Sequence, residues 1–250
     1  LSAVVGSVTA LNDVSAEHVV AVERERIAEF GHQMLAIVGH DLRNPLGAMV
    51  AGLALLDATT EGTRATPVVR RLESSTRRMT RIVEQLLDMT RARLGQGIPV
   101  EPRDMALLPL VTAAVDELTL AYPQVQFTLR EPIEVDGRWD PDRLSQVISN
   151  LMSNAAQYGK KGAPVTIQLA HLGDAVTITI TNAIRDKPIA PELLAVLFDP
   201  YRRGRGSERH HAGLGLGLYI VKEIVQAHRG RIEVESSEAG TSFCVVLPLR

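Results

Sequence analysis

Apolar residues recur along the first part of the chain at alternating spacings of four and three, which is the period of a helix packed in a bundle. The positions are Leu35, Gly39, Leu42, Leu46, Met49, Leu53 and Leu56. The pattern predicts a helix over residues 16–57 whose seam is buried against other helices. Pro45 interrupts this helix, because it lacks a backbone donor and favours a kink.

A second helix is predicted from about Val68 to Leu94, after a polar turn over residues 57–67. Leu72, Met79 and Leu86 form one heptad row of this helix. The adjoining row is Ser75, Ile82 and Met89. An antiparallel pair of such helices buries its seams poorly alone, so we expect two copies of the chain to form a dimeric four-helix bundle.

The Gly- and Pro-rich stretch over residues 95–104 predicts a linker, after which the pattern changes to alternating helices and strands. Helices are expected over residues 108–121, 141–158, 191–197 and 214–228, and strands over residues 125–130, 133–138, 164–170, 175–181, 231–236 and 241–247. This order favours a two-layer α/β sandwich with helices on one face of a mixed sheet. The fold class is therefore multidomain, α and α/β.

Composition narrows the class of protein. The 250 residues include 27 Lys and Arg and 29 Asp and Glu, a formal net charge of −2, which argues against nucleic acid as the main partner. Cys244 stands alone, as expected in a reducing compartment. No apolar run reaches the roughly 18 residues of a membrane span, so we expect this segment to be cytoplasmic and to make no membrane contact.

His40 is the first residue with candidate chemistry. It lies one position past the seam, so its ring is expected at the edge of the bundle, and Asn44 follows one helical turn later. The carboxylate of Asp41 can reach an imidazole nitrogen and make the other nitrogen a better nucleophile. A lone His on a helix surface most often has no role, so the rest of the chain must decide between the two interpretations.

Two further stretches carry the chemistry of a phosphate site. On the expected helix over residues 141–158, Asn150 and Asn154 stand four apart and share the face opposite the apolar positions. Amide oxygens are suitable hard ligands for Mg²⁺. Further on, Gly213, Gly215 and Gly217 precede a helix, where bare backbone donors and the helix N-terminus favour phosphate.

With HDLRNP around His40, the DRLSQVISNLMSNAAQYG stretch and the GLGLGL stretch, the chain resembles the sensor histidine kinases of two-component signalling. The resemblance implies the end of a PAS-like sensor domain over residues 1–15 and a signal helix over residues 16–31. A dimerisation and histidine phosphotransfer domain follows over residues 32–94, then a linker over residues 95–103. The ATP-binding domain, of the gyrase, Hsp90 and histidine kinase type, covers residues 104–250.

The resemblance also assigns roles to residues of the nucleotide site. His40 would be the phosphoacceptor, Asn154 the direct Mg²⁺ ligand and Asn150 part of the phosphate network, with Tyr158 against the nucleotide. Phe198 would anchor a Gly- and Arg-rich lid over residues 197–211. In this lid Arg202 or Arg203 would compensate the charge of the γ-phosphate. The cofactors implied are ATP and Mg²⁺.

Two stretches depart from the family pattern. Where the family has Asp-x-Gly-x-Gly after a strand, this chain has Asn182 in place of the Asp and neither glycine. An Asn carbonyl can still accept from the adenine amino group. Gln157 replaces a common Lys, which removes a phosphate-facing charge that Lys160 or Lys161 would have to replace.

The leading hypothesis is a kinase that transfers phosphate from Mg-ATP to His40 and then to an Asp of a response-regulator receiver domain, under control of an upstream sensor domain. The missing glycines leave two alternatives open. One is a phosphatase-dominated or kinase-deficient transmitter, in which Asn44 orients the attacking water. The other is a dimeric scaffold that has kept only the fold.

Overall fold

The computed structural model describes residues 46–53, 62–93, 95, 97–201 and 215–250. The chain divides into two compact units, Leu1–Ile82 and Val83–Arg250. His40, Asp41, Asn44, Arg202, Arg203 and Gly213 lie outside the described residues, as does the predicted PAS-like tail.

The described part of the first unit is helical. Residues 46–53 form a helix directly after Pro45, and α2 (Gly62–Arg93) begins in this unit and continues into the second. On α2 the two predicted heptad rows are the less exposed positions, while Val69, Thr76, Val83 and Leu87 are exposed. The periodicity therefore predicted the buried face of this helix.

The start of α2 differs from the prediction. The helix begins at Gly62, five residues before Pro67, within the stretch that was expected to be a turn. Pro67 is the sixth residue of this helix, so it removes one backbone hydrogen bond in the second turn without ending the helix. The preceding Thr-Arg-Ala run has no helix breaker, so the polar composition of this stretch was a poor guide.

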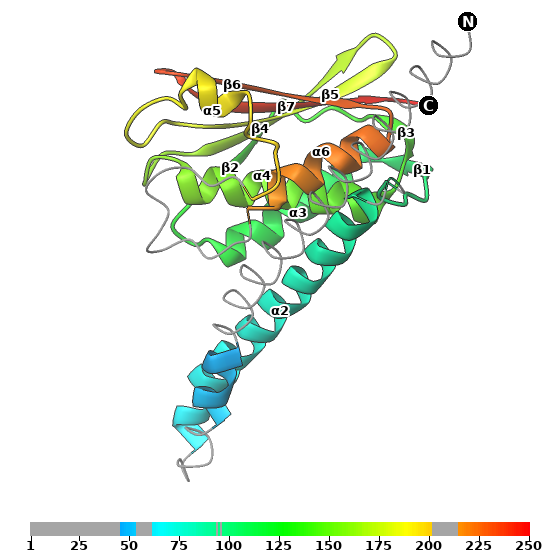
Figure 1. Ribbon diagram of the computed structural model, residues 1–250. Coiled ribbons are helices and arrows are strands. Elements are labelled where there is room, and N and C mark those ends of the chain that lie inside the picture. Colours follow the sequence, from blue (N-terminus) through cyan, green and yellow to red (C-terminus); the bar gives the residue numbers. More distant parts are fainter. Residues whose placement is uncertain (1–45, 54–61, 94, 96, 202–214) are drawn as a thin grey trace, which may run out of the picture. The chain divides into compact units, whose positions relative to one another are not determined.

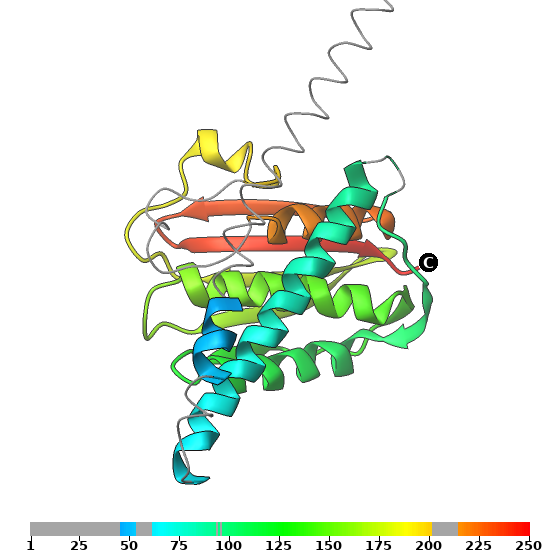
Figure 2. The ribbon, with the colours of Figure 1, turned by 60° about the horizontal axis from the view of Figure 1, so that its bottom comes forward.

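The second unit contains a five-stranded sheet in the order β2-β4-β5-β7-β6. Its strands are β2 (Phe127–Arg130), β4 (Val165–Leu172), β5 (Ala175–Asn182), β6 (Arg231–Ser237) and β7 (Gly240–Pro248). β2 pairs with β4 in parallel, and the other neighbours are antiparallel. In Figure 2 the β6–β7 hairpin is seen in orange and red. The sheet is therefore mixed, as predicted.

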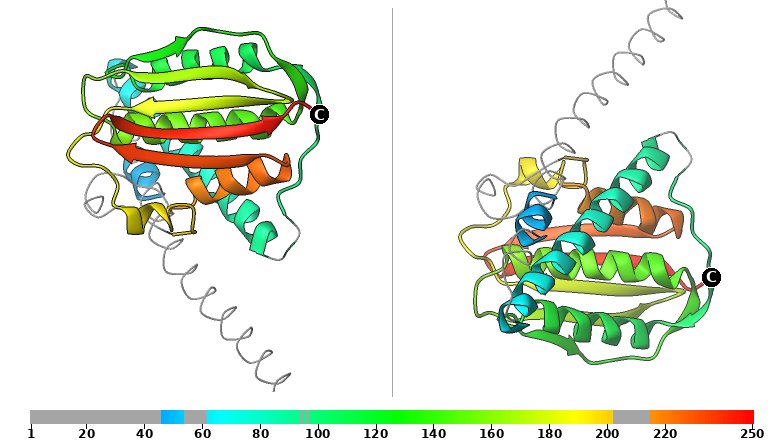
Figure 3. Two further views of the ribbon diagram at one scale, coloured as in Figure 1. Left: turned by 90° about the horizontal axis from the view of Figure 1, so that it is seen from above. Right: turned by 90° about the horizontal axis from the view of Figure 1, so that it is seen from below.

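Three helices cover one face of this sheet (Figure 1). They are α3 (Leu107–Ala121), α4 (Pro141–Tyr158) and α6 (Gly217–Ala227), and α4 lies between the other two (Figure 3). The buried positions of β5 alternate, so Val176, Ile178 and Ile180 face the helices. This alternation is what an antiparallel sheet with one covered face requires. The two-layer sandwich is confirmed.

A separate two-stranded sheet was not predicted. β1 (Arg103–Ala106) pairs antiparallel with β3 (Asp136–Trp139), so the end of the expected linker is a strand. The buried indole of Trp139 donates from Nε1 to the carbonyl of Pro248 at 2.8 Å. Its ring lies where a side chain at Gly137 would stand, with 2.2 Å to an added Cβ. Only glycine fits there, which explains its place in a strand.

The remaining bounds agree with the prediction to within a few residues, except that α5 (Pro191–Leu194) is shorter than expected. It continues as turns up to Leu197, so only its first four residues keep helical hydrogen bonding.

Candidate functional site

The central helix α4 is positioned by its first residues. The carboxylate of Asp140 caps the helix and accepts from the backbone N–H groups of Asp142 and Arg143 at 3.0 and 3.1 Å. Pro141 follows at the first helical position, where its missing N–H costs nothing. The apolar face of α4 is then buried, with Leu144, Ile148 and Leu151 fully covered. The opposite face, which carries the Asn residues, is thereby aimed away from the core.

Asn150 is half-buried on α4, and its Nδ2 atom is buried without a hydrogen-bond partner among the described residues. An orphaned buried donor of this kind costs free energy unless a ligand or water satisfies it. Asn154 stands one turn later on the same face and is also half-buried. Both predicted Asn residues therefore lie together on one side of the central helix.

The start of α6 lies beside Asn150. A Cβ added at Gly217, the first residue of α6, would be 3.9 Å from Cγ and Oδ1 of Asn150. Within the described part of the chain no side chain caps the N-terminus of α6, whose N-cap residue is Leu216, and Gly215 adopts a positive φ of 68°. Uncapped backbone donors, the helix dipole and the orphaned amide of Asn150 together suit the oxygens of a phosphate.

Asn182 is the last residue of β5 and is only 6% exposed. Its Nδ2 donates to the carbonyl of Ala183 at 3.1 Å, which leaves Oδ1 as the atom for accepting a further bond. The residue after α4, Gly159, packs against it, since a Cβ there would be 3.2 Å from the Cβ of Asn182. The end of α4, which carries Tyr158, is therefore close to Asn182.

Phe198 contacts the sheet beside the predicted lid. Its ring meets that of Phe243 on β7 edge to face, with centroids 6.4 Å apart and an interplanar angle of 86°. The backbone N–H of Tyr201 donates to the carbonyl of Gly215 at 3.1 Å. The two described residues that flank the segment over residues 202–214 are therefore held together.

Gln157 is held by a contact with the end of α3. Its Nε2 donates to the hydroxyl of Tyr122, at the end of α3, at 3.1 Å. Lys160 and Lys161 are exposed just after α4. This contact gives Gln157 a structural role that the comparison with a Lys at this position did not suggest.

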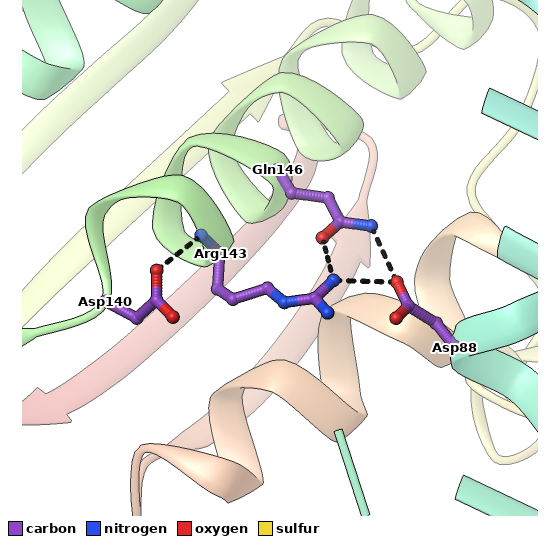
Figure 4. Close-up of polar contacts among 4 residues, drawn as sticks. All are labelled: Asp88, Asp140, Arg143 and Gln146. Carbon is purple, nitrogen blue, oxygen red and sulfur yellow. Dashed lines mark hydrogen bonds and ion pairs between the residues drawn. The ribbon is translucent and has the colours of Figure 1, made fainter. Parts of the chain in front are cut away.

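Sequence reasoning missed a polar cluster between the end of α2 and the start of α4. Arg143 donates from Nη1 to Oδ2 of Asp88 at 2.8 Å and to Oε1 of Gln146 at 3.0 Å (Figure 4). Gln146 donates from Nε2 to the same Asp88 oxygen at 3.2 Å. Asp88 is 3% exposed, so its charge is stabilised by these partners.

A second missed contact connects α4 to the end of α6. The backbone N–H of Asp140 donates to Nε2 of His228 at 3.0 Å, and Nδ1 of His228 lies 2.8 Å from the carbonyl of Ile224. A carbonyl only accepts, so Nδ1 is the donor in this contact. Burial raises the pKa of Asp140, but the backbone N–H groups of Glu101, Arg143 and Asp142, together with the nearby His228, lower it by more, and the net pKa is lowered.

The donor set fits a nucleoside triphosphate with Mg²⁺. The described residues include no group of three or more His, Cys, Asp or Glu side chains that would hold a metal by themselves. The amide oxygen of Asn154 is instead the kind of single ligand that Mg²⁺ uses when phosphates and waters complete its shell. Within the described part of the chain, no helix combines the length and hydropathy of a membrane-spanning segment.

Comparisons with known protein families agree with a site for a nucleoside triphosphate. Residues 32–95 match the model of the His Kinase A (phospho-acceptor) domain. Residues 139–250 match that of the histidine kinase-, DNA gyrase B- and HSP90-like ATPases. The chain belongs to the sensor histidine kinase family. Its two matched regions are arranged in the order that the sequence predicted, with the phospho-acceptor domain first.

Relatives of this histidine kinase include a bacteriophytochrome of Pseudomonas aeruginosa, 37% identical over 96% of this chain and 32% of its own length. The sensor histidine kinase TrcS of Mycobacterium tuberculosis is 36% identical over 87% of this chain and 43% of its own length. The chain therefore spans less than half the length of these two curated relatives.

Solved structures show the same fold. The histidine kinase ThkA, in complex with the response regulator TrrA, has a TM-score of 0.60 and 21% identity, over 91% of this chain and 64% of that one. The full-length kinase ShkA, in complex with AMPPNP, also has a TM-score of 0.60, with 23% identity, over 86% of this chain and 45% of its own.

Proposed function

We propose that this chain is the kinase portion of a longer sensor histidine kinase, which phosphorylates His40 from Mg-ATP and passes the phosphoryl group to an Asp of a response regulator. The cradle formed by Asn150 and the start of α6 carries the proposal, because an orphaned buried amide beside an uncapped helix N-terminus suits phosphate oxygens. The phospho-acceptor domain over residues 32–95 supplies the other half of the reaction.

In the proposed reaction, a nitrogen of His40 attacks the γ-phosphorus, the bond to the β,γ-bridging oxygen breaks, and ADP leaves. Asp41 receives the imidazole proton or orients the ring. Asn150 and the backbone at Gly213, Gly215 and Gly217 hold the phosphates, while Tyr158 and Asn182 hold the base. Arg202 or Arg203 compensates the charge that develops on the transferred group, and Phe198 anchors their segment.

Mg²⁺, when bound through Asn154, supplies charge neutralisation at the phosphates. Every other function in this site belongs to side chains and backbone of the chain itself. Because phosphoryl transfer depends mainly on positioning and electrostatics, neutral donors and a few Arg side chains suit the rest of the site.

We further propose a homodimer, an upstream sensor domain and a cytoplasmic location for this portion. The phospho-acceptor match and the exposed apolar face on residues 46–53 support the dimer. The complex of ThkA with the response regulator TrrA supports the class of partner. The sequence similarity of residues 1–15 to the end of a PAS domain supports the sensor domain.

The test is autophosphorylation with γ-labelled Mg-ATP, comparing the wild type with the variants His40→Gln and Asn154→Ala. We expect acid-labile label on the wild type, none on His40→Gln, and at least a hundredfold lower rate for Asn154→Ala, because phosphate charge is then poorly compensated. Label that persists on His40→Gln would contradict the assigned phosphoacceptor.

A second candidate function, response-regulator dephosphorylation, is favoured by the absence of the two glycines after Asn182. In this case Asn44 would orient a water toward the acyl phosphate of the regulator. Phosphorylated regulator mixed with Asn44→Ala should then lose its phosphate more slowly than with the wild type, while nucleotide binding is unchanged. Equal rates would exclude this role for Asn44.

A further inference from the structure

The segment between β5 and α5, residues 183–190, contains no glycine, although it follows the base-contacting position Asn182 directly. Ile184 and Asp186 stand where the related kinases have glycines. A segment without glycine cannot easily adopt positive φ, so its conformation must be held in another way. The contacts of this segment show how.

Arg185 reaches from this segment to the end of α4. Its Nε donates to the carbonyl of Gly159 at 3.1 Å, and its Nη2 donates to the carbonyls of Gly159 and Gln157 at 2.9 and 2.5 Å. The carbonyls in the last turn of a helix have no partner within the helix. A cation there also interacts favourably with the helix dipole. Arg185, which lies outside the helix, therefore supplies hydrogen-bond donors to the free carbonyl groups at the C-terminus of α4.

Backbone contacts hold the same two elements together. The backbone N–H of Lys160 donates to the carbonyl of Ala183 at 3.0 Å, and this oxygen also accepts from Nδ2 of Asn182. Gly159 has no room for a side chain, because an added Cβ would lie 2.5 Å from the carbonyl of Ala155 and 3.2 Å from Asn182. Asn182 is thus packed against the end of α4.

The guanidinium group of Arg185 bonds to the residues on either side of Tyr158. Gln157 and Gly159 both present their carbonyls to the guanidinium, so the backbone at Tyr158 is fixed between them. A planar guanidinium suits this bridging, since its donors have a fixed geometry that an ammonium lacks. The two residues expected to contact the base, Tyr158 and Asn182, are therefore connected by one side chain and one backbone bond.

We propose that Arg185 is a positioning residue of the nucleotide site. It takes the place of a glycine-containing turn and holds Asn182 and Tyr158 in the positions from which they contact the adenine base. The inference rests on the proposed function, because the base is that of ATP. Arg185 makes no contact with the nucleotide in this role. It lowers the conformational cost of binding by fixing the two residues in advance.

The test compares Arg185→Gln and Arg185→Lys with Lys187→Gln, which removes an exposed charge from the same segment. The affinities for Mg-ATP and for inosine triphosphate, which lacks the 6-amino group, are measured by calorimetry. Thermal unfolding without nucleotide is recorded for each variant. The ratio of the two affinities reports the position of Asn182 separately from general loosening of the fold.

We expect Arg185→Gln to weaken ATP binding about three- to tenfold and to weaken inosine triphosphate binding less, so that the preference for ATP narrows. Arg185→Lys should recover only part of the preference, and Lys187→Gln should match the wild type. An unchanged preference in Arg185→Gln, or an equal loss for both nucleotides, would overturn the positioning role while leaving the proposed function intact. A wild-type chain that binds no nucleotide would overturn both.

Discussion

At the scale of single residues, Asp140 has more partners than its place as a helix cap requires. Besides the two N–H groups at the start of α4, its carboxylate accepts from the backbone N–H of Glu101 at 2.8 Å, and its own N–H is held by His228. The residue thereby joins the stretch before β1, the central helix and the end of α6. The three N–H donors favour the ionised carboxylate, and the bond to His228 fixes the backbone of Asp140.

This lowered pKa predicts a pH dependence of stability. A carboxylate whose pKa is lower in the folded than in the unfolded state stabilises the fold fully above its unfolded value of about 3.9, and this stabilisation is lost as the pH falls through the folded pKa. Asp140→Asn keeps a good helix cap but has no charge to titrate. We expect its free energy of unfolding, measured in urea, to fall less steeply below about pH 4 than that of the wild type.

Asp142→Asn is the matched control, because this neighbour is exposed and makes no cap. This variant removes one carboxylate from the same turn without changing the cap, so it shows the effect of the lost charge alone. Trp139 is the single Trp of the chain and is 1% exposed, so its fluorescence reports the unfolding of the ATP-binding unit alone. If the free energy of unfolding of the wild type and of Asp140→Asn fell equally steeply with decreasing pH, the lowered pKa of Asp140 would be contradicted.

Several residues of the site were predictable and others were not, for a physical reason. Asn150, Asn154 and Asn182 belong to local patterns, and the structure places all three on the face or strand end that was expected. Arg185 stands at a variable position of the family pattern, between the two residues that replace its glycines, so no pattern singled it out. What it contacts depends on the packing of β5 against α4, which no local spacing encodes.

At the scale of elements, the last turns of α2 are joined to α4 by the cluster of Asp88, Arg143 and Gln146. Asp88 and Arg143 are 55 residues apart in the sequence, so no periodicity predicted the contact. The side chain of Arg143 is 21% exposed and that of Asp88 is 5% exposed. Water therefore reaches the ion pair mainly at Arg143 and screens the attraction between the two charges only in part.

A double-mutant cycle measures this contact. Asp88→Ala and Arg143→Ala should each lower the free energy of unfolding by about 1 to 3 kcal/mol, because each leaves a buried or half-buried charge without its partner. The double variant should cost clearly less than the sum, with a coupling of about 1 to 2 kcal/mol. Urea unfolding followed through Trp139 is the measurement.

The chain contains its own control for this cycle. Arg231 and Glu233 form an ion pair at 2.7 Å whose side chains are 62% and 58% exposed. Exposed pairs contribute about 0.2 to 1 kcal/mol at most. A coupling between Asp88 and Arg143 no larger than that between Arg231 and Glu233 would show that burial adds nothing to the contact.

Most elements were predictable from the spacing of apolar residues. The exceptions are segments that carry no such periodic signal. The bounds predicted for α4 agree with the structure, since its buried positions recur at helical spacing from Leu144 to Ala155. β1 was missed because a four-residue strand after Pro102 carries no alternation, and only its partner β3 makes it a strand. The beginning of α2 was missed because polar composition does not by itself end a helix.

At the scale of the whole molecule, the helix over residues 46–53 exposes large apolar side chains in the single chain. Leu46, Val50 and Leu53 are 46%, 65% and 58% exposed and stand four and three residues apart. Such a stripe on one helix face favours burial against another helix. Two copies of the chain would cover it in the proposed four-helix bundle.

Val50→Glu should therefore shift the proposed dimer toward monomer, because a carboxylate placed in a helix seam is costly to bury. Light scattering after size-exclusion chromatography, over a range of concentrations, measures the mass. Leu120→Glu is the control, since Leu120 is 84% exposed on α3 in the other unit. A Val50→Glu protein with the mass of the wild type would place the dimer interface elsewhere.

The strand order of the ATP-binding unit has a consequence for synthesis of the protein. β7 is the last of the five strands of this sheet to be translated, yet it lies between β5 and β6 in the interior of the sheet. Until it leaves the ribosome, β5 presents an open edge rich in Thr and Ile, and β6 has no neighbour in the sheet. Open strand edges on a nascent chain are sites of aggregation. We therefore expect this histidine kinase to need protection by chaperones late in its synthesis.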